Sequence, residues 1–272
     1  ALACIMEIPV AAASGAEPPA PAAAAMAAAA VTVAATAKSV THTAARRAAC
    51  AAGGRVATMP GITADCMIRC LAADYDRIAQ VTERLTAKLT AARVAHLTCP
   101  HGTDLEMSLE GIPAIASTGL IRRPGQGGNL PSGEAYLRPR EGSSEGLLFV
   151  DGSMADLGLL ATPLRLEIRG GLAVSISGGG EGQAERLAAL LDAHGPAART
   201  VAELGVGTND RAKVTGMVLE DEKVAGTVHV ALGNNVGMGG AVDVPIHLDG
   251  VLRRPTLTLD GELVVKDGRL LD

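Results

Sequence analysis

The spacing of apolar positions over the first 95 residues predicts strands that alternate with helices. An Ala-rich run favours a helix by intrinsic propensity, and the β-branched run after it favours a strand. Helices are predicted over 21–30 and 41–53, strands over 31–36 and 55–59, and one or two further helices over 63–93. This alternation is typical of a doubly wound α/β fold, so we predict a flavodoxin-like domain over residues 1–95.

The chain opens on a short apolar run, Cys4 to Pro9, that is expected to form a strand. No Met precedes this run, and a doubly wound domain rarely opens without an earlier element. We therefore expect the first strand and helix of this domain to be missing from the chain.

The pattern changes after residue 94. Short runs of alternating apolar and polar residues, separated by Gly and Pro, replace the long helices. Strands are predicted over 95–98, 105–109, 135–137, 146–150, 164–168 and 172–176, with one helix over 180–193. This texture favours a second domain over residues 96–272, of α+β class and rich in antiparallel strands.

Composition excludes several classes of partner. The net charge is −5 and no basic run exceeds two residues, so nucleic acid is not an expected partner. The whole aromatic set is Phe149, Tyr75 and Tyr136, which leaves no stacking platform for bases. Binding must therefore depend on metals, charges and backbone groups.

The uncharged stretch 20–37 is long enough to cross a bilayer, but Ala is weakly apolar and no flanking positive charges orient the stretch. We expect no membrane segment and no secretory signal. The five cysteines are an odd number in a chain too long for a disulfide scaffold. Reduced thiols and a cytoplasmic location are therefore predicted.

Candidate chemistry gathers between residues 200 and 250. Glu203, His229, His247 and Asp249 each lie on or beside an apolar run with strand character. Carboxylates and imidazoles at strand ends suit a metal site because rigid elements fix ligand geometry. His247 and Asp249 stand at positions i and i+2, so both are expected to reach one ion. Taken singly, each residue also has a plainer interpretation, as a core histidine or a solvated acid.

Five sequence blocks together resemble the aminopeptidase T family of metallopeptidases, often called leucyl aminopeptidase-like. They are NLPSGEA at 129–135, AELGVGTN at 202–209, LEDEK at 219–223, TVHVALG at 227–233 and HLD at 247–249. The resemblance implies a site for two divalent metal ions, zinc, manganese or cobalt, and a small-molecule or short-peptide substrate. It assigns the metal ligands to Glu134, Glu203, His229, His247 and Asp249.

Two carboxylates carry the expected catalysis. We predict that Glu203 bridges the two ions, because its strand is expected to run into a Gly turn that lets both ions approach the backbone. Glu222 matches an acidic residue just before the His-bearing strand of the family and is the candidate general base. Its flanking acids leave a solvated acidic turn as an equal alternative.

The chain departs from that family at one position. Family peptidases carry a Tyr a few residues after the His that corresponds to His229, whereas residues 233–240 contain none. A related branch, the 2,5-dihydroxypyridine ring-cleaving dioxygenases, holds a single Fe(II) with two His and one Asp. In that pattern a His stands where this chain has Glu203, and the positions of Glu134 and His229 are apolar.

Three functions follow, in this order. Because Glu134, Glu203 and His229 are all present, a metal-dependent hydrolase that attacks an amide or peptide bond with metal-activated water ranks first. A mononuclear Fe(II) dioxygenase ranks second, and an inactive binding protein on the same fold ranks third. Metal content separates them: about two ions of zinc, manganese or cobalt per chain, one oxygen-sensitive Fe(II), or none.

The expected substrate is small and polar, because the chain offers few aromatic side chains for a bulky hydrophobic group. Asn234 and Asn235 follow the strand of His229 and are candidate substrate contacts, able to replace the missing phenol as donors. Lys38 and Arg46 follow the second predicted strand, where open α/β sheets bind ligands, and are further candidates.

Assembly is predicted from the Gly-rich apolar segment 236–244, which lies between two ligand-bearing strands. A solvent-exposed loop would normally be polar. We therefore predict a homodimer with this loop near the active-site entrance or the subunit contact. The alternative is that the loop folds back on its own domain, with its glycines serving only tight turns.

Overall fold

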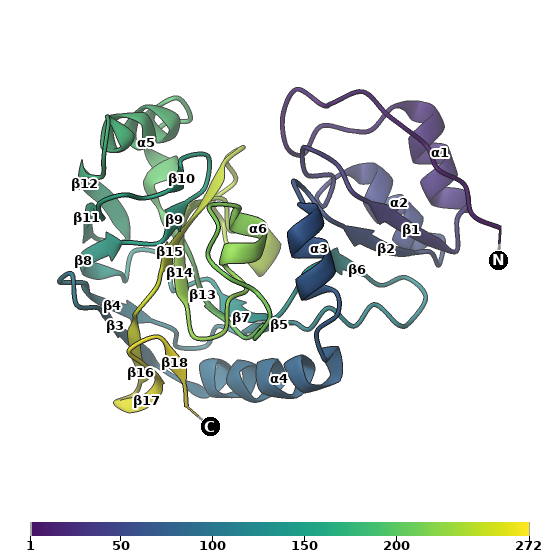
Figure 1. Ribbon diagram of the computed structural model, residues 1–272. Coiled ribbons are helices and arrows are strands. Elements are labelled where there is room, and N and C mark those ends of the chain that lie inside the picture. The colour runs from purple at the N-terminus through teal and green to yellow at the C-terminus, as the bar shows by residue number, and fades with distance from the viewer. Residues whose placement is uncertain (1, 272) are drawn as a thin grey trace. The chain divides into compact units, whose positions relative to one another are not determined.

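The computed structural model describes residues 2–271 as a mixed α/β protein that divides into two compact units (Figure 1). The N-terminal unit runs up to Ala72 and takes in Gly119–Ser132, and the C-terminal unit comprises Ala73–Thr118 and the chain from Gly133 on. This division differs from the boundary at residue 95 expected from the pattern. The long helix before residue 95 belongs to the C-terminal unit, because its apolar face packs there.

The N-terminal unit contains a three-stranded parallel sheet in the order β1-β2-β6, counted over the described residues. Its elements are α1 (Ala20–Ala28), β1 (Val31–Ala34), α2 (Ala44–Ala51), β2 (Arg55–Thr58), α3 (Ala64–Cys70) and β6 (Gly127–Asn129). Thr43 and Thr63 cap α2 and α3, each accepting a hydrogen bond from a backbone N–H of the first turn. The flavodoxin-like assignment of this unit stays a prediction.

One expectation for the N-terminal unit is wrong, since residues 4–9 form no strand. The pattern also predicted no strand at β6, which pairs with β2 through a Gly-rich stretch. Pairing is possible there because Gly127 lies so close to α2 that a Cβ would stand 2.9 Å from the Cys50 sulfur. A pattern search misses such a strand because glycine carries no side chain to alternate.

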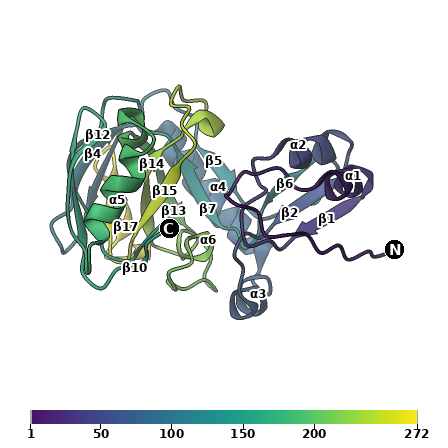
Figure 2. The ribbon, with the colours of Figure 1, turned by 90° about the horizontal axis from the view of Figure 1, so that it is seen from above.

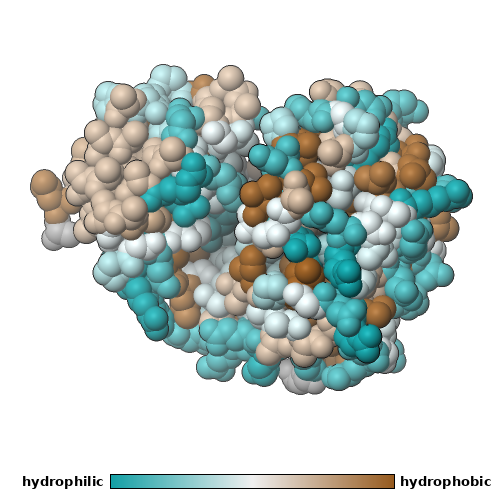
Figure 3. Space-filling view, turned by 180° about the vertical axis from the view of Figure 1, so that it is seen from behind, coloured by the Kyte–Doolittle hydropathy of each residue, from teal (hydrophilic) through white to brown (hydrophobic). Residues whose placement is uncertain are grey.

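The helix α1 contributes little to the core. Its buried residues are Ala22 and Met26, so most of its alanines face solvent. The space-filling view shows them as a weakly hydrophobic, tan surface over the N-terminal unit (Figure 3). Helix propensity and the contact of Met26 with Ala45, Ala49 and Val56 therefore hold this helix. Over residues 2–271 we find no helix with the length and apolarity to span a membrane.

The C-terminal unit is built on two antiparallel sheets, as its alternating pattern predicts. Within the described chain, one sheet has seven strands in the order β10-β9-β15-β14-β13-β7-β5, and the other has eight in the order β12-β11-β8-β4-β3-β16-β17-β18. The strands of the first are β5 (Ile115–Ser117), β7 (Glu134–Leu137), β9 (Ser153–Met154), β10 (Gly158–Leu159), β13 (Val201–Gly207), β14 (Val228–Gly233) and β15 (His247–Leu252). Those of the second are β3 (Val94–Thr98), β4 (Asp104–Ser108), β8 (Glu145–Val150), β11 (Leu164–Arg169), β12 (Leu172–Gly178), β16 (Thr256–Leu259), β17 (Glu262–Lys266) and β18 (Arg269–Leu270).

One apolar core serves both sheets and the helices on them. It joins Leu97 of β3 and Leu204 of β13 with Leu89 of α4 (Tyr75–Ala91) and Leu187 of α5 (Gln183–Asp192). Helix α4 packs on β7 and β5, and α5 packs on β12 (Figures 1 and 2). The short helices η1 (Pro196–Arg199), α6 (Val218–Asp221) and η2 (Val236–Met238) lie in the connections. The sheet that carries the site is therefore backed by a continuous core.

Truncating Leu89 tests this packing. Leu89→Ala is expected to lower the free energy of unfolding of the C-terminal unit by about 2–5 kcal/mol, because the completely buried side chain would leave a cavity. Denaturant unfolding followed by circular dichroism measures the change. Lys88→Ala is the control, since its ion pair with Glu262 is solvent-exposed and should matter by less than about 1 kcal/mol. Equal effects of the two substitutions would contradict the assignment of α4 to this core.

Candidate metal centre

The candidate ligands project from one face of four adjacent strands of the seven-stranded sheet. In the ladders, Gly207 pairs with Glu134, Gly205 with His229, Ala231 with Asp249, and Gly233 with His247. Directly opposed residues of an antiparallel pair share a face, and residues two apart along a strand do too. Glu134, Glu203, His229, His247 and Asp249 therefore all lie on the same face.

The five side chains meet around Glu203. Its Oε1 lies 3.2 Å from His229 Nε2, and its Oε2 lies 3.3 Å from His247 Nε2. His247 Nε2 is also 3.4 Å from Asp249 Oδ1, and His229 Nε2 is 3.5 Å from Glu134 Oε2. The pairing of His247 with Asp249 that their i, i+2 spacing predicts is thus present.

Two groups of donors share the Glu203 carboxylate. The first group consists of Glu203, His247 and Asp249. The second consists of Glu134, Glu203 and His229. Within each group the donor atoms lie within 4.8 Å of one another. Each group offers one imidazole nitrogen and two carboxylates, an oxygen-rich set that suits a divalent transition metal. The His229 side chain is fully buried, whereas that of His247 is 32% exposed, so the His247 group is the one open to solvent.

Gly205 makes room for His229. A Cβ at residue 205 would stand 2.0 Å from His229 Nε2, so no other residue fits beneath the ring. Gly205 lies inside β13, and the Gly turn expected after Glu203 does not exist there. Gly205 lets the His229 imidazole lie across the strand and reach Glu203. This function was not predicted from the sequence.

Lys223 also joins the centre, although sequence reasoning assigned it no function. Its side chain is 1% exposed, and Nζ lies 2.6 Å from Glu134 Oε1 and contacts Glu222 Oε1. The backbone near Lys223 passes over β13, where a Cβ on Gly207 would be 2.1 Å from the Val224 carbonyl oxygen. Its place directly after Glu222 in the LEDEK block was the available signal.

Backbone groups orient His247. Its Nδ1 lies 2.8 Å from the carbonyl oxygen of Asn234, which leaves Nε2 facing Glu203 and Asp249. Such a partner fixes the tautomer and the ring plane of a metal-binding histidine. By contrast, His229 Nδ1 is buried and has no hydrogen-bond partner among the described residues. Only the Nε2 side of His229 therefore takes part in the cluster.

The asparagines predicted to bind substrate brace a loop in the structure. Asn234 Nδ2 donates to Asp243 Oδ1 and to the Val244 carbonyl, over 3.2 and 3.0 Å. Asn235 Nδ2 donates to Glu141 at 3.0 Å, and its side-chain oxygen accepts from the Val242 N–H at 2.9 Å. These bonds hold the connection between the strands of His229 and His247. Contact with substrate stays a prediction for both residues.

The other predicted substrate residues belong to the N-terminal unit. Lys38 is exposed, and its carbonyl oxygen accepts from the Thr36 hydroxyl at 2.6 Å. Arg46 Nε donates to the Thr41 carbonyl oxygen at 2.7 Å. Both follow the end of β1, as expected, and their assignment to substrate binding stays a prediction.

The cluster shifts the pKa values of its members strongly. Burial opposes charge on His229, but hydrogen bonding to Glu203 and the charges of Glu134, Glu203 and Asp249 outweigh it and raise its pKa to about 9. The pKa of His247 is raised well above its usual value, because Asp249 and Glu203 overcome the same penalty. Burial disfavours charge on Glu203 too, yet its hydrogen bonds with His229 and His247 lower its pKa.

Glu222 differs from the other carboxylates. Burial raises its pKa to about 8, with Asp249 and Glu134 adding to the effect and Lys223 opposing it. A carboxyl group that titrates near neutrality suits the exchange of a proton. Its side chain is 12% exposed, so the solvated acidic turn that was its alternative is not what the structure shows.

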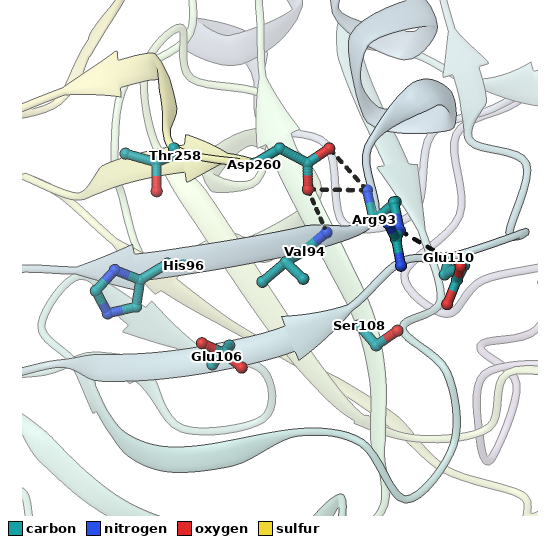
Figure 4. A pocket seen from close by; sticks show the side chains of 9 residues that line it. Arg93, Val94, His96, Glu106, Ser108, Glu110, Thr258 and Asp260 are labelled. Carbon is teal, nitrogen blue, oxygen red and sulfur yellow. Dashed lines mark hydrogen bonds and ion pairs between the residues drawn. The ribbon is translucent and has the colours of Figure 1, made fainter.

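A pocket away from these donors lies on the outer, polar face of the eight-stranded sheet (Figure 4). Charged groups in it already have partners: Asp260 accepts from the backbone N–H groups of Arg93 and Val94, and Arg93 Nε lies 3.4 Å from Glu110. Because these charges are already paired and exposed, we assign this groove no chemistry.

A cluster of carboxylates and imidazoles on one face of an antiparallel sheet, in a mixed α/β fold, could hold a divalent metal ion, as in the class of metal-dependent enzymes. The chain belongs to the NicX family, described as 2,5-dihydroxypyridine 5,6-dioxygenase, which matches residues 9–272. The 2,5-dihydroxypyridine 5,6-dioxygenase of Pseudomonas putida strain KT2440 is 30% identical over 198 residues. That match covers 66% of this chain and 55% of the relative, so the chain spans about half of the length of this curated relative.

Two solved structures share the fold. The structure of 2,5-dihydroxypyridine dioxygenase from Pseudomonas putida KT2440 is similar with a TM-score of 0.78 and 25% identity, over 92% of this chain and 74% of that one. Wild-type AmpT from Thermus thermophilus gives a TM-score of 0.68 at 18% identity, over 93% of this chain and 80% of that one. At that identity the second likeness concerns the fold alone.

The hydrolase expectation is therefore wrong, together with the metallopeptidase and aminopeptidase class that it implied. The family and the curated relative are dioxygenases, and the aminopeptidase is a structural neighbour only. The five blocks misled because both classes of enzyme share the fold that the blocks belong to. The missing Tyr after His229 was the contrary signal.

Substituting Gly205 tests the geometry of the centre. Gly205→Ala is expected to displace the His229 ring and to weaken metal binding by about 10-fold or more, because the new methyl group overlaps Nε2. Calorimetric titration of the metal-free protein with Mn²⁺ measures the affinity. Gly237→Ala is the control, since a Cβ there meets nothing within 4 Å. An unchanged affinity in Gly205→Ala would show that His229 does not support the metal.

Metal binding should release protons. His229, with its pKa raised to about 9, and His247, raised well above the usual value, are protonated near pH 7 in the metal-free protein. A metal ion requires neutral imidazoles, so affinity should rise as pH increases toward about 9, the pKa of the His229 imidazole. Calorimetry in two buffers of different ionisation enthalpy counts the released protons. A release of none would contradict the charged state of these histidines.

Proposed function

We propose that this chain is a metal-dependent ring-cleaving dioxygenase that acts on a dihydroxylated pyridine or a closely related nitrogen heteroaromatic. The observation that carries the proposal is the donor group Glu203, His247 and Asp249 on one sheet face, in a chain of the NicX family. His247 is the partly exposed member, so substrate would approach from its side.

The donors fit Fe(II), the metal that the family implies. Imidazole and carboxylate are its usual ligands in mononuclear oxygenases, which commonly combine two histidines with one carboxylate. This chain departs from that pattern by presenting Glu203 in place of one histidine. The neighbouring group of Glu134 and His229 leaves a second divalent ion, zinc, manganese or cobalt, as the alternative stoichiometry.

The reaction named for the family opens the ring between positions 5 and 6, and both atoms of O₂ enter the product. No external electron donor is needed, since the substrate itself is oxidised. A bound metal would supply the activation of O₂ and the binding of a substrate hydroxyl group.

The side chains around the site would orient the metal donors and hold a proton near them. Asn234 fixes the ring of His247 through its carbonyl oxygen. His229 holds one oxygen of Glu203, so that the other oxygen faces His247. Glu222, whose pKa is raised to about 8, can hold or give up a proton near neutrality. Each of these functions follows from contacts that exist before substrate arrives.

Further parts of the proposal concern the surroundings of the site. Asn234, Asn235, Lys38 and Arg46 remain candidate substrate contacts. A homodimer in a cytoplasmic setting, with the loop 236–244 near the entrance, remains the expected assembly. Val236 of this loop is 48% exposed, which agrees with a segment available to a partner or to substrate.

Ring cleavage tests the proposal. The protein loaded with Fe(II) under anaerobic conditions should consume one O₂ per 2,5-dihydroxypyridine when air is admitted, with loss of the pyridine absorbance. Asp249→Asn should lower the rate at least about 100-fold, because it removes a charged donor. Asp192→Asn, on the exposed end of α5, is the matched control. Hydrolysis of aminoacyl amides with no O₂ consumption would contradict the proposal.

A further inference from the structure

A buried lysine lies beside the centre, and no ligand function is assigned to it. Lys223 is 1% exposed, and its ammonium group contacts the carboxylates of Glu134 and Glu222. A buried ammonium without partners costs several kcal/mol, so lysine is rarely retained in such a place unless carboxylates face it. Both of its partners lie at the candidate metal centre.

The contacts of Lys223 continue toward the metal donors. Its Nζ holds Glu134 Oε1 at 2.6 Å, while the second oxygen of Glu134 lies 3.5 Å from His229 Nε2. His229 Nε2 in turn lies 3.2 Å from Glu203 Oε1. Lysine, glutamate, histidine and glutamate thus form a line of alternating positive and negative groups that ends on a donor of the His247 group.

We propose that Lys223 is a positioning residue for the metal centre, acting through Glu134 and His229 on the Glu203 carboxylate. This inference rests on the proposed metal site and extends it to a residue that does not touch the metal. By holding one oxygen of Glu134, Lys223 leaves the other oxygen to orient His229. By orienting His229, it fixes which oxygen of Glu203 is left for the metal.

Two features distinguish this line from an ordinary buried ion pair. First, Gly205 and Gly207 have no side chains, which lets the His229 ring and the backbone at Lys223 approach β13 closely. Packing of the helix and loop around Lys223 would not require both glycines. His229 also lacks any partner for Nδ1 among the described residues, so its Nε2 contacts are what orient the ring. Loss of the Lys223 ammonium group is therefore expected to displace the metal donors.

The test uses Co²⁺ as the probe, added to metal-free protein and followed by visible absorption. Lys223→Met, which keeps the length of the side chain without its charge, should weaken Co²⁺ binding by about 10–100-fold and change the Co²⁺ spectrum. Ser153→Ala is the control: Ser153 lies on the same sheet face as the donors, has no part in the line, and donates a buried 2.6 Å hydrogen bond to Asp221 of α6 that this substitution removes. It should keep the wild-type affinity and spectrum.

A double-mutant cycle identifies the path. If Lys223 acts through Glu134, Glu134→Gln should weaken Co²⁺ binding similarly. The double variant should then bind Co²⁺ as well as the single variant that has the lower affinity. Additive losses, or a folded Lys223→Met protein with wild-type affinity and spectrum, would overturn the inference. Should Lys223→Met fail to fold, Lys223→Gln takes its place with the same criteria. Wild-type protein that binds no Co²⁺ would instead refute the proposed metal site itself.

Discussion

The centre depends on one carboxylate that two imidazoles share. Glu203 faces His229 with one oxygen and His247 with the other, and this arrangement is possible only because Gly205 leaves the strand surface bare beneath the His229 ring. The sheet supplies the rest of the geometry, since four neighbouring strands in register deliver every donor to the same face. The continuous core behind these strands makes that register rigid, which a metal centre requires.

Electrostatic attraction favours the clustering of these side chains. Burial penalises each charge, yet opposite charges alternate from Lys223 to Asp249, so the pKa shifts favour paired ions. The raised pKa values favour protons on both histidines, and a bound metal ion would replace those protons. The distances between these groups, and not the composition of the chain, decide whether attraction outweighs the cost of burying the charges.

The sequence predicted the local features of the fold well. Alternation located β3, β4, β7, β8, β11 and β12 of the C-terminal unit, and the i, i+2 rule placed His247 and Asp249 on one face. It missed β6 and took Gly205 for part of a turn, because the function of a glycine depends on what approaches it from elsewhere in the chain. Lys223 was overlooked for the same reason, since its partner Glu134 lies on a distant strand. The reaction class was misjudged because one fold carries different chemistries, so a likeness of sequence blocks does not decide between them.

The location of bound iron tests the central claim most directly. Crystals of the Fe(II)-loaded protein, measured on both sides of the iron absorption edge, should show one anomalous peak within roughly 2.0–2.3 Å of donor atoms of Glu203, His247 and Asp249. A peak confined to other residues, or none at this sheet face under conditions that support O₂ consumption, would contradict the account.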